Sequence, residues 1–73
     1  MNSYEAIATR MNNAVDSFIN DLIELGFNVT DAEKIFNLYK KEKIIKLDAA
    51  MGRYNLTHGA FWDMDVLNRA AKL

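Results

Sequence analysis

Residues 3–25 read SYEAIATRMNNAVDSFINDLIEL, and this stretch decides which folds the rest of the chain can adopt. Its apolar residues follow one another at alternating spacings of four and three, which places them along one face of an α-helix. Asn2 and Glu5 have the pattern of a capping box, and Gly26 provides the left-handed residue of a Schellman ending. We therefore expect a long amphipathic N-terminal helix over residues 3–25. Its apolar stripe consists of Tyr4, Ala8, Met11, Val15, Phe18, Leu22 and Leu25.

A second helix is expected from Thr30 to about residue 42. It starts with the capping-box sequence TDAE at residues 30–33, whose two acids suit the positive end of the helix dipole. Apolar residues then recur at helical spacing, and lysines gather where cations stabilise a helix C-terminus. The apolar positions are Ala32, Ile35, Phe36 and Tyr39, and the lysines are Lys40, Lys41 and Lys43.

The apolar pattern changes after residue 44 from the helical period to the alternation of β-strands. Two alternating segments flank the loop AAMG at residues 49–52, which predicts a hairpin closed by that loop. A competing interpretation continues the second helix into residues 43–57 as far as a cap at Gly52, and the sequence leaves both open. In the hairpin, the facing pairs would be Ile45 with Leu56, Leu47 with Tyr54, and Asp48 with Arg53, the last of them an ion pair.

Residues 58–62 read HGAFW and are expected to connect the hairpin to a short C-terminal helix capped by Asp63. Phe61 and Trp62 cannot easily bury both rings in the same direction, so one of them is expected at the surface or in an interface. The order helix, helix, hairpin, helix predicts a mainly α domain with a small β-hairpin, which is an α+β fold. We expect residues 1–73 to form a single domain. The core-facing residues of the last helix would be Met64, Leu67, Ala70 and Ala71.

The composition narrows the chemistry that is open to this chain of 73 residues. It contains no cysteine and one histidine, which excludes disulfides, thiolate zinc sites and histidine-rich metal sites. No apolar run approaches the roughly 20 residues that span a bilayer, and the first residues lack the pattern of a signal peptide, so we expect a cytoplasmic protein. A core of this size contributes only about 3–5 kcal/mol of net stability, which leaves oligomerisation as the one common supplement.

The sequence contains no recognisable arrangement of residues for catalysis. His58 is the only histidine, and no nucleophile or orienting group accompanies it in a known pattern. Its more common role would be a hydrogen bond to the backbone at the end of the hairpin. The three glycines are isolated, so the chain has no glycine-rich phosphate loop. We expect a protein that is not an enzyme and needs neither a cofactor nor a metal.

A group of basic residues is the most distinctive chemical feature of the sequence. Such a group suits contacts to phosphates, although a solvated helix end with a charged edge strand has the same composition. The isoelectric point near 5.7 is low for a nucleic-acid-binding protein. Two aromatic residues add a candidate stacking or protein-binding site. The candidate partner-binding residues are Lys40, Lys41, Lys43, Lys46, Arg53, Tyr54 and Trp62.

The long helix is the expected docking site for a second chain. A helix of about 23 residues measures roughly 34 Å at 1.5 Å per residue, and the second helix covers about half of that length. In one interpretation, the domain's own hairpin and last helix cover the remainder. In the other, part of the stripe is shared with a second copy, and the seam of this homodimer would consist of Met11, Val15, Phe18 and Leu22.

Three segments resemble the C-terminal part of small accessory proteins encoded by phages, prophages and mobile elements. They are YKKEKIIKLD at residues 39–48, GRY at residues 52–54 and HGAFWDMDVL at residues 58–67, within a region that covers residues 36–70. The resemblance transfers no functional residue. It implies a protein that binds a host protein or nucleoprotein complex stoichiometrically, as anti-CRISPR and other anti-defence inhibitors do, or one that binds DNA as a regulator.

Three functions are therefore expected, in order of preference. The first is binding to a host protein or nucleoprotein complex, with an anti-CRISPR-like inhibitor as its most specific form. The second is a small DNA- or RNA-binding regulator that uses the basic residues of the second helix and the hairpin. The third is a structural homodimer. The partners would be macromolecules of the cytoplasm, and no membrane is involved.

Overall fold

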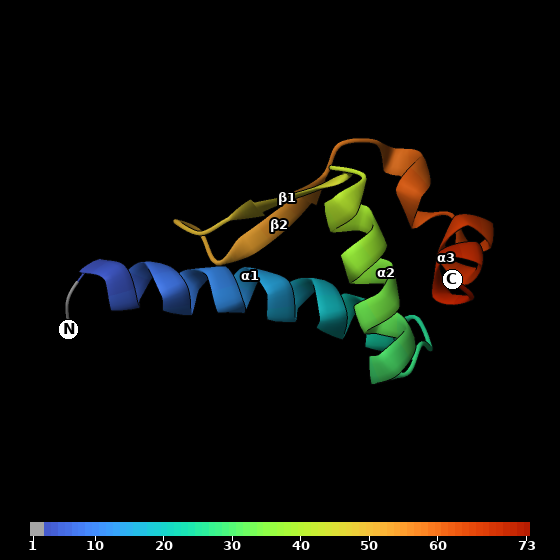
Figure 1. Ribbon diagram of the computed structural model, residues 1–73, viewed down its shortest axis with the longest axis horizontal. Coiled ribbons are helices and arrows are strands. Elements are labelled where there is room, and N and C mark those ends of the chain that lie inside the picture. The colour runs from blue at the N-terminus through green and yellow to red at the C-terminus, as the bar shows by residue number, and fades with distance from the viewer. Residues whose placement is uncertain (1–2) are drawn as a thin grey trace.

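The computed structural model describes the backbone of residues 3–73 and the side chains of residues 12–73. Figure 1 shows α1 along the long axis of the molecule, a hairpin lying beside it, and α2 crossing between the hairpin and α3. The predicted fold class, mainly α with a small β-hairpin, is confirmed. In chain order the elements are α1 (Ser3–Glu24), α2 (Val29–Lys41), β1 (Ile45–Asp48), β2 (Arg53–Leu56), the 3-10 helix η1 (Gly59–Trp62) and α3 (Met64–Ala71).

The end of α1 is the predicted Schellman motif. The Phe27 N–H donates to the Leu22 carbonyl oxygen at 3.1 Å, and the Gly26 N–H donates to the Ile23 carbonyl oxygen at 3.0 Å. Gly26 has φ +109°, a conformation in which a side chain would be strained. The predicted end of the first helix is therefore confirmed. The capping box predicted from Asn2 and Glu5 lies outside the residues whose side chains are described.

The start of α2 differs from the prediction. Asn28, not Thr30, is the N-cap residue, because its extended backbone lets the side-chain oxygen accept a hydrogen bond from the Asp31 N–H at 2.8 Å. Asparagine is a better N-cap than threonine, and Asn28 is the first residue after the Schellman motif that can take this role. Thr30 lies inside the first turn of the helix.

The end of α2 repeats the Schellman pattern without a glycine. The Ile44 N–H donates to the Tyr39 carbonyl oxygen at 2.8 Å, and the Lys43 N–H donates to the Lys40 carbonyl oxygen at 3.1 Å. Lys43 occupies the left-handed position with φ +58°. This motif stops the helix and turns the chain directly into β1. The alternative in which the second helix continues through this region is therefore wrong.

The hairpin has the register that the sequence predicts. Asp48 and Arg53 face each other, but the Asp48 carboxylate accepts a hydrogen bond from the Met51 N–H at 3.2 Å, within the turn, instead of the predicted ion pair. The Thr57 N–H donates to the Ile44 carbonyl oxygen at 2.7 Å, which extends the pairing past the strands. The antiparallel pairs are Ile45–Leu56, Lys46–Asn55, Leu47–Tyr54 and Asp48–Arg53.

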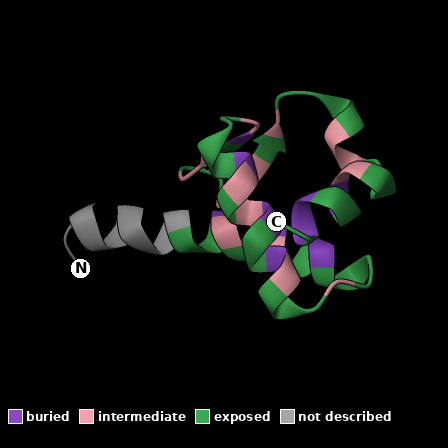
Figure 2. Ribbon diagram, turned by 45° about the vertical axis from the view of Figure 1, so that its right-hand side comes forward, coloured by how far each residue is buried: buried purple, intermediate pink, exposed green. Residues whose placement is uncertain are grey.

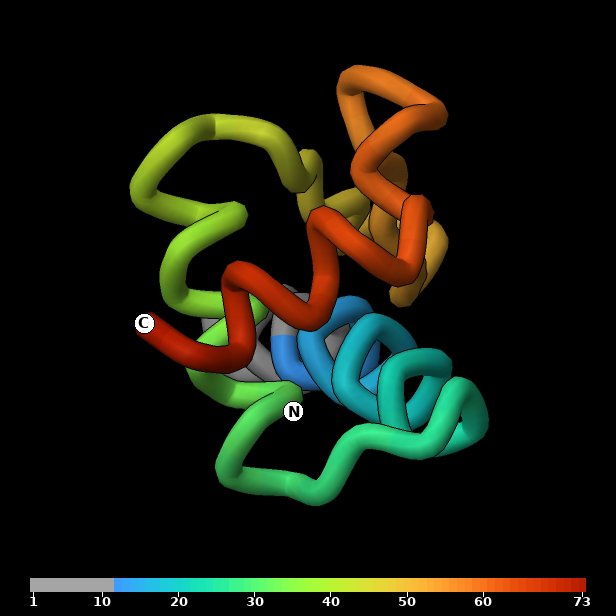
Figure 3. The backbone as a smooth tube through the Cα atoms, turned by 90° about the vertical axis from the view of Figure 1, so that its right-hand side faces the viewer, coloured from blue at the N-terminus to red at the C-terminus, as the bar shows by residue number. Residues whose placement is uncertain are grey.

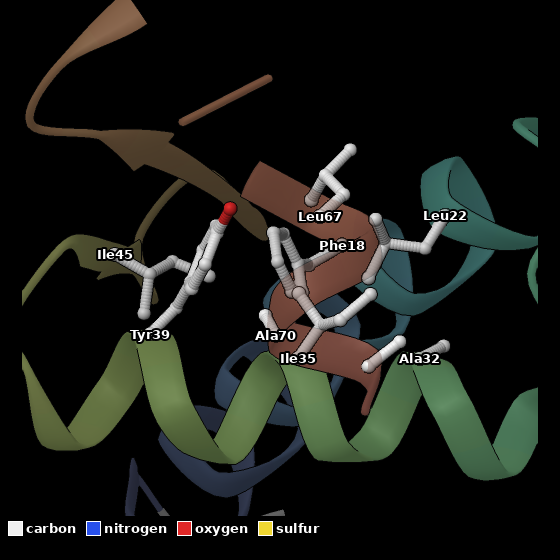
Figure 4. Packing of buried hydrophobic residues seen from close by; sticks show 9 residues of the cluster. Phe18, Leu22, Ala32, Ile35, Tyr39, Ile45, Leu67 and Ala70 are labelled. Atoms are coloured by element: carbon white, nitrogen blue, oxygen red, sulfur yellow. The ribbon is translucent and has the colours of Figure 1, made fainter. Parts of the chain in front are cut away.

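The core lies where the three helices and the base of the hairpin meet, and Figure 2 shows the buried residues gathered there. Figure 3, viewed along α1, shows α3 running between η1 and α2 at that end of the molecule. The Phe18 side chain lies in the middle of this cluster (Figure 4) and has no exposed surface. Rings from α2, β2 and η1 surround it, with centroid distances of 5.9 Å to Phe36, 5.9 Å to Tyr39, 5.0 Å to Tyr54 and 6.0 Å to Trp62.

The predicted dimer seam is wrong at two of its four positions. Phe18 and Leu22 have no exposed surface within the single chain, because α2, α3 and the hairpin already cover this face of α1. Val15 is half-buried, and the side chain of Met11 lies outside the described residues. Phe18 and Leu22 therefore belong to the core of one copy, whereas Leu25, at the end of the stripe, is 46% exposed.

We expect Phe18→Ala to remove about 3–5 kcal/mol from the free energy of unfolding, because the cavity would separate rings from three other elements. Urea denaturation followed by circular dichroism measures this loss. Ile23→Ala, at a position 40% exposed on the same helix, is the control and should cost much less. A Phe18→Ala variant that keeps its stability and changes only its oligomeric state would contradict this assignment.

Lys43→Gly should raise the free energy of unfolding by about 1 kcal/mol, since glycine adopts the left-handed conformation without the side-chain penalty. The corresponding rise in Tm is about 4–8 °C for a domain of this size. The matched control is Lys41→Gly, which places a glycine in the helical backbone two residues earlier. This variant should lower the free energy of unfolding by about 1 kcal/mol. Equal effects of the two variants would show that Lys43 carries no backbone strain.

Candidate functional site

The five basic residues that the sequence singles out are all exposed. Lys40 and Lys41 belong to the last turn of α2, and Lys43 follows the helix directly. Lys46 and Arg53 lie on β1 and β2 respectively. The C-terminal end of α2 leads directly into the hairpin, so these residues follow one another in neighbouring parts of the fold (Figure 1). We call Lys40, Lys41, Lys43, Lys46 and Arg53 the basic surface.

The alternation of the strands separates the hairpin into two faces. The inner face consists of the apolar pairs Ile45–Leu56 and Leu47–Tyr54, which pack on the core beside α1. The outer face consists of the polar pairs Lys46–Asn55 and Asp48–Arg53. Lys46 and Arg53 are diagonal neighbours on this outer face, a relation that places residues about 7–8 Å apart.

Asn55 is a member of the outer face that the sequence analysis did not single out. It is exposed and lies directly opposite Lys46. The signal was present in the sequence, because the alternation that predicted the inner face also places Asn55 on the outer one. The charge pattern alone does not reveal it, since its side chain is neutral.

The net charge of −1 is the sum of two oppositely charged parts of the chain. Residues 11–33 contain five acidic residues and no basic one, whereas residues 34–53 contain six basic and two acidic residues. The first part is the C-terminal half of α1 with the start of α2, and the second is the rest of α2 with the hairpin. At physiological ionic strength, exposed charges separated by more than about 8 Å are largely screened from one another. The field at the basic surface therefore depends mainly on its own five cations and on the neighbouring acids Glu42 and Asp48, and less on the net charge of the whole chain.

The two aromatic candidates, Tyr54 and Trp62, pack against the core. The Tyr54 ring packs edge-on against Phe18, and its hydroxyl donates a hydrogen bond to the Asp21 carboxylate. Trp62 lies 6.0 Å from the rings of both Phe18 and Tyr54, measured between centroids. Both side chains are half-buried, so neither is a free stacking platform.

Phe61 and Trp62 were expected to differ, with one ring at the surface or in an interface, but both are half-buried and pack against the core. They lie in successive positions of the 3-10 helix η1, and each ring finds its own partner. The Phe61 ring packs 5.7 Å from that of Tyr39, whose hydroxyl donates to the Phe61 carbonyl oxygen at 2.7 Å. Trp62 instead packs toward Phe18 and Tyr54. The tight turn of η1 lets neighbouring residues bury their rings in different directions.

His58 has the structural role that the sequence favours. Its Nδ1 atom accepts a hydrogen bond from the Ala60 N–H at 3.2 Å, which caps the start of η1. Among the residues that the structure describes, no group of three or more histidines, cysteines or carboxylates is placed to hold a metal ion. None of the described helices is long and apolar enough to cross a bilayer.

The link between Tyr54 and Asp21 makes stability depend on pH. Burial, followed by the hydrogen bond to the Asp21 carboxylate and the repulsion from its charge, raises the pKa of Tyr54 well above its ordinary value of 10. Burial also raises the pKa of Tyr39. A raised folded-state pKa contributes stability below the unfolded-state pKa, and this stability is lost as the pH rises through the folded-state pKa.

We expect Tyr54→Phe to lower the free energy of unfolding by about 1 kcal/mol near pH 8, because the hydrogen bond to Asp21 is lost. Between about pH 9 and 11, the wild type should lose more stability than this variant, since only the wild type has Tyr54 to ionise on unfolding. Urea denaturation at a series of pH values measures both effects. Parallel stability curves for the two proteins would show that Tyr54 does not contribute to the pH dependence.

Comparison of the chain with protein-family models, with curated proteins and with solved structures finds no match. The resemblance of residues 36–70 to accessory proteins of phages and mobile elements therefore stays a prediction. Among the candidate residues, the five cations of the basic surface are the ones that are exposed in the described structure.

Proposed function

We propose that this protein is a small, non-enzymatic binding protein of the cytoplasm that contacts nucleic acid, either free or within a host nucleoprotein complex, through the basic surface. The observation that carries the proposal is the contrast between the two sets of candidate residues. All five cations are exposed, whereas both aromatic candidates are used by the core. A contact made by this surface is therefore governed by charge.

Phosphates are the chemical groups that such a surface binds best. Lysine and arginine side chains displace the cations condensed on a nucleic acid, and the release of these cations drives association. Lys40 and Lys41 lie in the last turn of α2 and are both exposed, and the Lys40 Nζ atom lies 6.0 Å from the centroid of the Phe36 ring. Protein-binding hot spots, by contrast, depend on buried tryptophan, tyrosine and arginine anchors, and here the described aromatic rings of the candidate site pack inward.

A host nucleoprotein complex as the partner would account both for the basic surface and for the resemblance to phage-encoded proteins. A protein of 73 residues that binds such a complex stoichiometrically can block it without catalysing a reaction. An anti-CRISPR-like inhibitor is the most specific form of this proposal, and a regulator that binds free DNA or RNA is the alternative form. Both forms require that the basic surface binds nucleic acid.

We expect the protein to bind a fluorescently labelled, mixed-sequence DNA duplex with an affinity that falls as the salt concentration rises. Each cation that contacts a phosphate contributes about −0.9 to the slope of log K against log salt, so two to four contacts give a slope of about −2 to −4. Replacing Lys40 and Lys41 together by glutamine should reduce the slope by about 2. Fluorescence anisotropy between about 50 and 200 mM salt measures these values.

Lys72→Gln is the matched control. Lys72 is exposed and follows α3, beside the loop that joins α1 to α2 and away from the basic surface. Its replacement removes one positive charge, where the double variant removes two, and should leave both the affinity and the slope unchanged. Absence of binding both to this duplex and to a mixed-sequence RNA at the lowest salt concentration, or binding that does not change with salt, would overturn the proposal and favour a protein partner.

A further inference from the structure

We propose that the hairpin enters the major groove of duplex DNA with its outer face against the base edges, where Lys46, Arg53 and Asn55 read the sequence. This inference rests on the proposed function, because it assumes that the basic surface binds nucleic acid. It specifies the kind of nucleic acid that is bound, the groove that the hairpin enters and the side chains that contact the bases. Lys40, Lys41 and Lys43 would contact the phosphates beside the groove.

The dimensions of the hairpin fit this groove. The sheet has two strands only, each of four residues, so it forms a narrow ribbon. Neighbouring strands lie about 4.8 Å apart, and the major groove of B-DNA is about 12 Å wide, enough to admit a two-stranded ribbon with its side chains. The inner face packs on the core beside α1, so the outer face is the one available to a groove.

The residues of the outer face have the chemistry of base readout. Lysine and arginine donate to the O6 and N7 acceptors of guanine, and asparagine makes a paired contact with the N6 and N7 atoms of adenine. Lys46 lies directly opposite Asn55, and Arg53 is the diagonal neighbour of Lys46. These separations of about 5 and 7–8 Å suit contacts to base pairs one or two steps apart. The three side chains are exposed, as readout requires.

Asp48, the one acidic residue of this face, makes a hydrogen bond within the turn. The Asp48 carboxylate accepts the hydrogen bond from the Met51 N–H at 3.2 Å, so it is engaged within the protein. The turn lies against α1, where the Ser17 hydroxyl donates a long hydrogen bond of 3.5 Å to the Gly52 carbonyl oxygen. The ribbon is therefore supported at its tip as well as at its base, which favours a preorganised reading surface.

Duplex RNA does not offer the same site. The major groove of an A-form helix is deep and narrow, so side chains on a ribbon cannot reach its base edges. Charge alone would bind DNA and RNA duplexes alike, whereas docking in the major groove predicts a preference for DNA. A preference for the DNA duplex over the RNA duplex would therefore support docking in the major groove, whereas equal binding would indicate a contact driven by charge alone.

The experiment is a selection of binding sites from a DNA duplex library with a randomised centre, followed by anisotropy titrations of the selected duplex. The wild type should enrich a short motif and bind it more tightly than a scrambled duplex and than the RNA duplex of the same sequence. Asn55→Ala should lower the affinity for the selected duplex by about tenfold and relax the preference at one base pair. Its binding to the scrambled duplex and its salt slope should not change.

Asn68→Ala is the matched control, since Asn68 is an exposed asparagine on α3 and should leave the selected motif unchanged. Salt-dependent binding without an enriched motif, equal binding of DNA and RNA duplexes, or an Asn55→Ala variant that keeps the full preference would each overturn the groove inference while the proposed function stands. Absence of any duplex binding would overturn both.

Discussion

The aromatic packing around Phe18 is the interaction on which the rest of this structure depends. Its ring lies within 6.0 Å of four other rings, and these belong to α2, β2 and η1. A small domain without disulfides has little other means of joining its elements, since few of its side chains are fully buried. The large area that each aromatic ring removes from water compensates for the small number of core residues.

This packing also decides which surface remains for binding. Because the inner face of the hairpin packs on the core beside α1, the strand alternation turns Lys46, Arg53 and Asn55 outward. The left-handed Lys43 turns the chain out of α2 and brings β1 next to the helix end that carries Lys40 and Lys41. The core and the candidate binding surface are thus two consequences of one arrangement, so a substitution at Phe18 would disturb both.

Local signals in the sequence predicted some features and missed others for identifiable reasons. Gly26 predicted the end of α1, and the apolar alternation around residues 49–52 predicted the register of the hairpin. Both predictions succeeded because a helix end and a hairpin register depend on residues that are close in the chain. The cap of α2 was misplaced because Asn28 and Thr30 are both acceptable caps, and only the path of the chain after the Schellman motif selects Asn28. The strained Lys43 had no signal at all, since lysine is unusual in that conformation.

By itself, the sequence determined the order of the three α-helices, the register and the two faces that a hairpin would have, and the separation of charge along the chain. These follow from periodicity, turn residues and composition, which act over a few residues. The tertiary structure alone decided that Phe18 and Leu22 belong to the core of one copy and that Tyr54 and Trp62 pack inward. The physical reason is that burial depends on which distant segments meet, and the spacing of residues along one helix or strand does not specify its partner.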